Sequence, residues 1–140
     1  EGAPRLVFDG AHTAGAARAL AETLREEHVA GVTLVLAVMQ DKDPAAIMTP
    51  LLPFATRIIV TATQSPRAMA VDAVIAALTP LGLPVTSACD VAAALELARL
   101  AAGRSGTVLV TGSLTTVAEA REALGLATPD PVVEESGAGG

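Results

Sequence analysis

Gly31-Val32-Thr33-Leu34-Val35-Leu36-Ala37-Val38 is a continuous apolar stretch in which one threonine is the single interruption. An apolar run without polar alternation is typical of a strand that is buried on both faces of a parallel sheet. The run is also much too short to cross a lipid bilayer as a helix. It therefore predicts a strand of a sheet that helices cover on both sides.

On either side of this stretch, shorter β-prone runs alternate with segments of helical periodicity. Further strands are expected at residues 5–8, 57–61, 85–87 and 106–111. Helices are expected at residues 14–27, 44–52, 65–78, 91–102 and after residue 113. Alternating strands and helices indicate βαβ units with right-handed crossovers. The predicted fold class is thus α/β: a three-layer α/β/α, Rossmann-like and mostly parallel sheet of five to six strands.

Several helices carry recognisable start signals in the sequence. The dipeptides Asp43-Pro44 and Ser65-Pro66 combine a capping side chain with a proline at the first helical position. Asp90 precedes the fourth helical segment and is placed as its N-cap. Thr116 and Glu119 have the spacing of a capping box for the last helix.

The length of 140 residues fits a single domain. Residues 1–127 carry the alternating pattern, whereas residues 128–140 are rich in Pro, Glu and Gly and form a tail that we expect to be partly disordered. Val132-Val133 in this tail is a candidate edge strand, the sixth of the sheet. The chain opens at Glu1 without a signal-like start, which suggests an excised piece of a longer, cytoplasmic protein.

Composition excludes several classes of function. Fifteen acidic and nine basic residues give a net charge of −6, and aromatic residues make up 1% of the chain. Without a basic patch or an aromatic surface, nucleic-acid binding is disfavoured. A single Cys excludes an internal disulfide, and no His/Cys cluster has metal-ligand spacing. The chain also lacks the G-x-x-x-x-G-K-[ST] pattern, so we expect no P-loop, no metal site and no membrane partner.

Polar residues gather where the predicted strands end, which is where open parallel sheets bind ligands. Asp9 and His12 follow the first strand. Asp9 is suited to ribose hydroxyls, and His12 to a phosphate or a base edge. The alternative is that Asp9 and Thr13 cap the turn and that His12 is an exposed loop side chain.

Lys42, Arg67 and Ser113 follow other predicted strands. Lys42 is the chain's one lysine and is suited to a phosphate or carboxylate, although a solubilising loop cation would look the same. Arg67 lies near an expected helix start, where the helix dipole disfavours a cation, so it indicates a carboxylate ligand unless it pairs with Asp72. Gly112-Ser113 either lets backbone N–H groups approach a ligand or is a tight turn with a serine cap.

Four strand-end segments, taken in order, carry a family pattern. Asp9-Gly10-Ala11-His12-Thr13 is similar to D-G-A-H-N, and Asp41-Lys42-Asp43 is similar to the end of G-x-x-x-D-K-D. Ser65-Pro66-Arg67-Ala68 is similar to N-P-R-A, and Val108-Leu109-Val110-Thr111-Gly112-Ser113 to V-x-V-T-G-S. Together they resemble the C-terminal domain of the Mur ligase superfamily, above all its folylpolyglutamate synthase/dihydrofolate synthase branch.

The resemblance implies a domain of an ATP-dependent ligase that joins L-glutamate to a folate through an acyl-phosphate. One set of residues would lie on the nucleotide side: Asp9, His12 and Lys42. A second set would hold the incoming glutamate: Ser65, Arg67 and Ser113. No catalytic residue is implied. The P-loop and the magnesium ligands would belong to a missing central ATPase domain, which makes ATP and Mg²⁺ ligands of the full-length enzyme. The domain alone would bind no cofactor and be inactive.

Two other readings of the sequence remain open at this point. A peptidoglycan-type Mur ligase, or another amino-acid ligase, would share most of these segments. A stand-alone flavodoxin-like or receiver-like binding domain would share the fold class. A receiver requires an Asp after the third strand, however, and residues 61–65 contain none.

Overall fold

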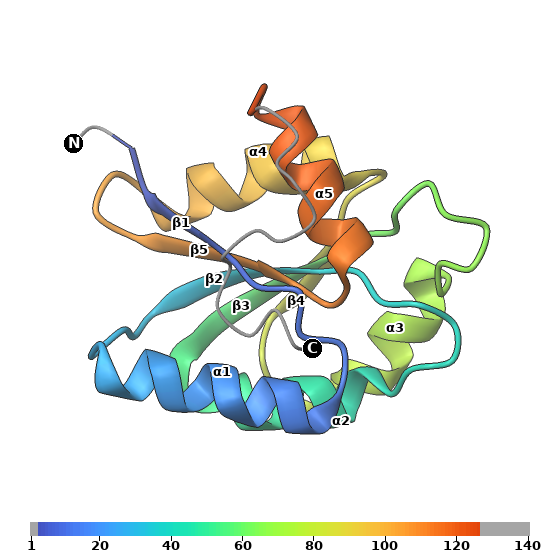
Figure 1. Ribbon diagram of the computed structural model, residues 1–140, viewed down its shortest axis with the longest axis horizontal. Coiled ribbons are helices and arrows are strands. Elements are labelled where there is room, and N and C mark those ends of the chain that lie inside the picture. Colours follow the sequence, from blue (N-terminus) through green and yellow to red (C-terminus); the bar gives the residue numbers. More distant parts are fainter. Residues whose placement is uncertain (1–2, 127–140) are drawn as a thin grey trace.

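A five-stranded sheet runs through the middle of the molecule (Figure 1). The computed structural model describes residues 3–126. The strands are β1 (Arg5–Phe8), β2 (Val32–Leu36), β3 (Ala55–Val60), β4 (Val85–Ser87) and β5 (Thr107–Thr111). Their order is β1-β5-β2-β3-β4, and every pairing is parallel. The predicted α/β class is confirmed, while the candidate sixth strand and the tail lie outside the described residues.

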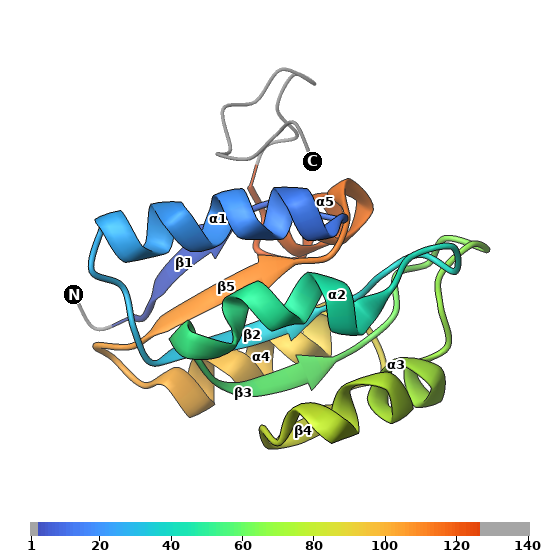
Figure 2. The same ribbon diagram turned by 90° about the horizontal axis from the view of Figure 1, so that it is seen from below.

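Helices cover both faces of the sheet (Figures 1 and 2). On one face lie α1 (Ala14–Glu26), α2 (Pro44–Met48) and α3 (Val71–Leu78), and on the other lie α4 (Val91–Ala102) and α5 (Leu114–Ala123). Two 3₁₀ helices, η1 (Thr49–Phe54) and η2 (Thr79–Leu81), extend α2 and α3. The chain steps across the sheet in one direction from β1 to β4 and returns to place β5. Since crossovers between parallel strands are right-handed, the return connection takes the opposite face.

Strand β2 shows why the apolar stretch around it is so uniform. All five of its residues are buried. Leu34 and Leu36 point into the core under α1, α2 and α3, whereas Val35 points into the core under α4 and α5. Because successive side chains of a strand face opposite sides, a strand between two helical layers favours apolar residues on both faces, and Thr33 is the one polar side chain buried in β2.

Three helix starts follow local capping chemistry. Thr13 caps α1 by accepting a hydrogen bond from the Ala16 N–H, and Asp90 caps α4 in the same way. Asp43 caps α2, with Pro44 at the first helical position as predicted. The helix expected at residues 44–52 is α-helical for five residues and then continues as η1, which contains Pro50 and Pro53. Proline lacks the N–H that an α-helical turn requires.

The expected helix start at Ser65-Pro66 is wrong. Helix α3 begins at Val71, and no side chain caps it. The intervening backbone pairs with the segment that follows β2 instead. The Met69 N–H donates to the Val38 carbonyl at 2.9 Å, and the Gln40 N–H donates to the Arg67 carbonyl at 2.8 Å. Backbone groups that are used in this pairing cannot also start a helix.

The capping box expected for the last helix is also wrong. Ser113 is the N-cap of α5, and its hydroxyl oxygen accepts a hydrogen bond from the Thr116 N–H at 3.0 Å. Thr116 therefore stands at the third helical position, whereas the capping box predicts it at the N-cap itself. Glu119 is accordingly too far along the helix to reach the N-terminal N–H groups.

None of the helices within residues 3–126 has both the length and the apolar character that a membrane span requires.

Candidate functional site

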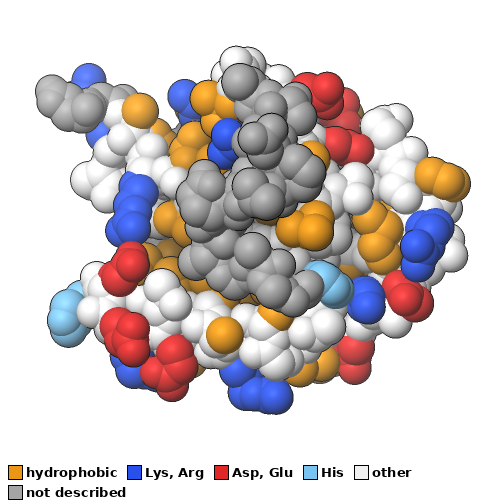
Figure 3. Space-filling view, viewed as in Figure 1, with side chains coloured by type: hydrophobic (Ala, Val, Ile, Leu, Met, Phe, Trp, Pro, Cys, Tyr) orange, Lys and Arg blue, Asp and Glu red, His pale blue; other side chains and the backbone are white. Residues whose placement is uncertain are grey.

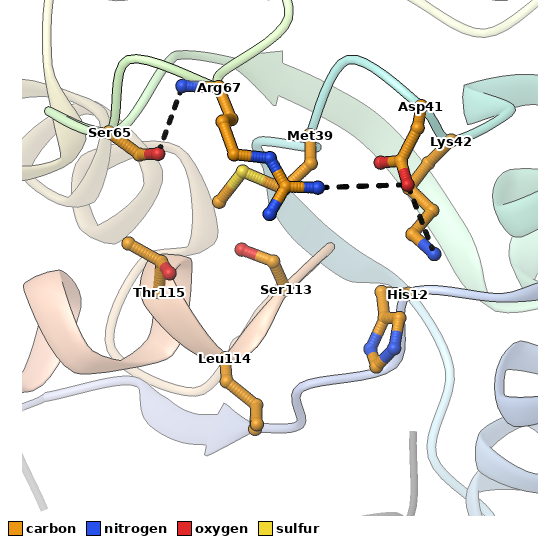
Figure 4. A pocket seen from close by; sticks show the side chains of 9 residues that line it. All are labelled: His12, Met39, Asp41, Lys42, Ser65, Arg67, Ser113, Leu114 and Thr115. Carbon is orange, nitrogen blue, oxygen red and sulfur yellow. Dashed lines mark hydrogen bonds and ion pairs between the residues drawn. The ribbon is translucent and has the colours of Figure 1, made fainter.

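A pocket of about 290 Å³ opens at the carboxyl ends of the strands (Figure 4). Its lining comes from the loops after β1, β2, β3 and β5 and from the first turn of α5: His12, Met39, Asp41, Lys42, Ser65, Arg67, Ser113, Leu114 and Thr115. After β1 and after β2 the chain turns to one face of the sheet. After β5, which lies between these two strands, it turns to the opposite face. This divergence is the switch point at which open α/β sheets form ligand crevices.

The pocket brings together five of the six site residues that the sequence predicts. His12, Lys42, Ser65, Arg67 and Ser113 come from four different loops, yet all of them line it. On the surface, side chains of both charges gather over the loops that follow β2 and β3, and a histidine lies beside them (Figure 3). The predicted clustering of these residues at one edge of the sheet is therefore found, while their individual roles remain predictions.

Asp9 is the exception, because it does not line the pocket. Its side chain is fully buried, and its Oδ1 accepts a hydrogen bond from the Ala11 N–H at 2.9 Å. This bond shapes the turn that carries His12. The structure thus contains the alternative that the sequence left open, in which Asp9 caps the turn.

His12 projects into the pocket from that turn (Figure 4). Its Nδ1 lies 3.1 Å from the Gly10 carbonyl oxygen. Since a carbonyl oxygen can only accept, Nδ1 carries the proton and donates. The contact fixes the tautomer and leaves Nε2 as the ring nitrogen that can meet a ligand.

Two cations and one carboxylate share the pocket wall. Asp41 Oδ2 lies 3.8 Å from an Arg67 guanidinium nitrogen and 3.9 Å from the Lys42 ammonium (Figure 4). The Arg67 and Asp41 side chains are 72% and 57% exposed, so solvent screens this pair strongly. Arg67 stands in a turn before α3, and its partner is Asp41, so the expected helix-start position and the pairing with Asp72 are both wrong. Arg67 can therefore exchange Asp41 for an anionic ligand at little cost.

Ser65 and Ser113 both have structural partners. The Ser65 oxygen accepts from the Arg67 N–H at 3.1 Å, which closes the turn. Ser113 is buried, and its oxygen lies 2.8 Å from the Thr116 hydroxyl, which itself donates to the Ala37 carbonyl. The single Thr116 hydroxyl proton is used on Ala37, so Ser113 is the donor of its pair. The alternative reading of Ser113 as a helix cap is confirmed.

Asp41, Met39, Leu114 and Thr115 also line the pocket but were not among the predicted site residues. Asp41 stands beside Lys42 in the same motif, so the motif itself was the available signal. The other three carry no chemistry that marks a site in sequence. In residues 3–126, no group of three or more His, Cys, Asp or Glu side chains could hold a metal ion.

Comparison with known proteins places these loops in a family context. A family model described as the Mur ligase, glutamate ligase domain, matches residues 1–114, well over half of the chain. The dihydrofolate synthase/folylpolyglutamate synthase of Mycobacterium tuberculosis is 34% identical over 140 aligned positions, covering 88% of this chain and 28% of that protein.

Solved structures agree with the sequence match. Mycobacterium tuberculosis folylpolyglutamate synthase complexed with ADP and AMPPCP has a TM-score of 0.80 at 32% identity, over 89% of this chain and 30% of that one. E. coli FolC in complex with DHPP and ADP has a TM-score of 0.75 at 28% identity, over 87% and 29%. The chain thus spans less than a third of the length of these relatives. The strand-end motifs, the parallel sheet and the family match agree that this chain belongs to the Mur ligase family as its C-terminal, glutamate ligase domain.

Proposed function

We propose that this domain is the C-terminal part of a cytoplasmic, ATP-dependent ligase that adds L-glutamate to a folate. In the proposed reaction, a folate carboxylate attacks the γ-phosphate of ATP and gives an acyl-phosphate and ADP. The glutamate amine then displaces inorganic phosphate and forms the amide. The observation that carries the proposal is one pocket in which His12, Lys42, Ser65, Arg67 and Ser113 meet, in a chain related to folylpolyglutamate synthases.

In this proposal the pocket divides into two sides. Lys42 and His12 face the nucleotide, where a point-charge ammonium suits phosphate oxygens and His12 Nε2 suits a phosphate or the base. Asp9 acts through the turn that it shapes under His12. Ser65, Arg67 and Ser113 face the amino acid. The planar guanidinium of Arg67 matches a carboxylate with two parallel hydrogen bonds.

The remainder of the ligase would supply what these residues do not offer. A bifunctional folylpolyglutamate synthase/dihydrofolate synthase structure contains Mn, AMPPNP and L-glutamate. Of the residues that line the pocket here, Asp41 alone has a carboxylate, which does not fit a metal that needs several oxygen ligands. We therefore propose that ATP and Mg²⁺ bind mainly to a central ATPase domain that closes against this pocket.

The test measures glutamate addition to a folate by the whole ligase. Arg67→Ala should raise KM for glutamate by about tenfold or more, because a charge-assisted carboxylate contact is lost. His12→Ala should raise KM for ATP instead. Arg104→Ala is the matched control, since Arg104 is exposed and does not line the pocket. An unchanged KM for glutamate in Arg67→Ala contradicts its assignment, and turnover of a peptidoglycan precursor in place of folate contradicts the substrate.

A further inference from the structure

Glu119 makes a contact that its place in the sequence does not suggest. Its Oε2 reaches from α5 across to the loop between β3 and α3, where it accepts a hydrogen bond from the Gln64 N–H at 2.8 Å. The two residues are 55 positions apart. A carboxylate acceptor makes this bond stronger than one between neutral groups. Glu119 is therefore a brace between helix and loop.

The loop that Glu119 reaches, residues 61–70, carries two residues of the pocket wall, Ser65 and Arg67. Its second half is fixed by the strand-like pairing with residues 38–40. Its first residue, Thr61, is still held at the sheet by the Leu36 and Ala88 carbonyls, and the chain then bends at Gln64. Within this first half, the Ser65 N–H donates to the Thr63 hydroxyl at 3.3 Å, a long bond inside the loop itself. The Glu119 contact ties this turn to the body of the domain.

Helix α5 also contributes to the pocket directly, at its N-terminus. Ser113 caps the helix and lines the pocket, and the Thr116 hydroxyl fastens the first turn to the Ala37 carbonyl. Glu119 therefore projects from a helix whose start is anchored beside the same pocket. A brace on such a helix holds Gln64, and with it the adjacent Ser65, at a fixed spacing from Ser113.

We propose that Glu119 is a positioning residue for the amino-acid side of the pocket. By holding Gln64, it sets where Ser65 stands, although it does not line the pocket itself. The Ser65 hydroxyl in turn accepts from the Arg67 N–H, while the Arg67 carbonyl is held by Gln40. The inference rests on the proposed function for the identity of the substrate. The bracing of the loop stands on the geometry alone.

The experiment compares three variants of the whole ligase. Glu119→Ala removes the acceptor, whereas Glu119→Gln keeps an oxygen that can accept from the Gln64 N–H. Glu122→Ala is the matched control, because Glu122 is an exposed glutamate on the same helix. We expect Glu119→Ala to raise KM for glutamate about tenfold with KM for ATP unchanged. Glu119→Gln and Glu122→Ala should stay near the wild type.

Hydrogen exchange of residues 61–70, read by mass spectrometry, tests the brace independently of activity. Exchange should accelerate at least about fivefold in Glu119→Ala and not in the other two variants. Unchanged exchange overturns the brace. Faster exchange with an unchanged KM for glutamate overturns its role in positioning, as does an equal rise in KM for ATP. A wild-type ligase that adds no glutamate to folate overturns the proposed function alone, because exchange still decides whether Glu119 fixes the loop.

Discussion

Gly112 lies where the ends of three strands meet. Its φ of +119° is in the region that side chains disfavour, and an added Cβ would collide with the backbone carbonyl of Ala37. Its own N–H donates to the Ala11 carbonyl at 3.1 Å. The turn from β5 into α5 thus packs directly against the segments after β1 and β2, with no room for a side chain.

Gly112→Ala should lower the free energy of unfolding by about 2 kcal/mol or more, because strain and a backbone clash add. Gly10→Ala is the comparison. A Cβ there would meet the side chain of Leu114, which is 55% exposed and can rotate away. Its cost should stay below about 1 kcal/mol. Urea denaturation measures both, and equal losses would contradict the account of Gly112.

At this scale the sequence predicts the residues that chemistry marks and misses those that only the fold brings near. His12, Lys42 and Arg67 were identifiable because polar side chains at strand ends face one edge of a parallel sheet. Glu119 was not, since its contact with Gln64 depends on how α5 packs beside a loop 55 residues away. A local sequence pattern carries no information about a contact between residues so far apart in the chain.

Helix starts show the same division at the scale of elements. Asp90 caps α4 as its position predicts, with Oδ1 accepting from the Ala93 N–H at 2.8 Å. Ser65-Pro66 carries a similar signal, yet α3 begins at Val71. Local capping chemistry determines a helix start only where the backbone has no stronger partner. Here the pairing of Met39 with Ala68 is such a partner.

Asp90→Ala should therefore cost about 1 kcal/mol of unfolding free energy, the usual value of a lost N-cap, and Asp90→Asn should restore most of it. Ser65→Ala should cost only a few tenths of a kcal/mol, because its hydroxyl caps no helix and closes an exposed turn. Chemical denaturation of the three variants measures the difference. A Ser65→Ala loss as large as that of Asp90→Ala would show that Ser65 supports α3 after all.

On the scale of the whole molecule, the sequence predicts the layers but not the order of the strands. Alternating β and α segments require crossovers, and right-handedness assigns a face to each helix once the order is known. Nothing local states that β5 lies between β1 and β2. That placement creates the switch point and hence the pocket, so the edge of the sheet was predictable and the exact crevice was not.

The open pocket leads to a prediction for the chain by itself. The Arg67 and Asp41 side chains in its wall are largely exposed, so a ligand bound here would keep one side in water. We expect the isolated 140-residue chain to bind ATP with a Kd weaker than about 1 mM, and the whole ligase to bind it far more tightly. Isothermal titration calorimetry makes the comparison. Micromolar binding by the isolated chain would mean that it holds a complete nucleotide site.

The position of β5 also governs how the chain can fold. In the described sheet β1 pairs only with β5, in a register that sets Arg5 beside Thr107, so β1 has no partner until β5 has been synthesised. Closing so long a loop is slow, and until it closes β1 and one edge of β2 expose unpaired backbone groups. During synthesis the ribosome must therefore release nearly the entire domain before its sheet can close. A chain cut before Thr107 would leave β1 without a partner and one edge of β2 open, the condition under which nascent proteins aggregate or engage chaperones.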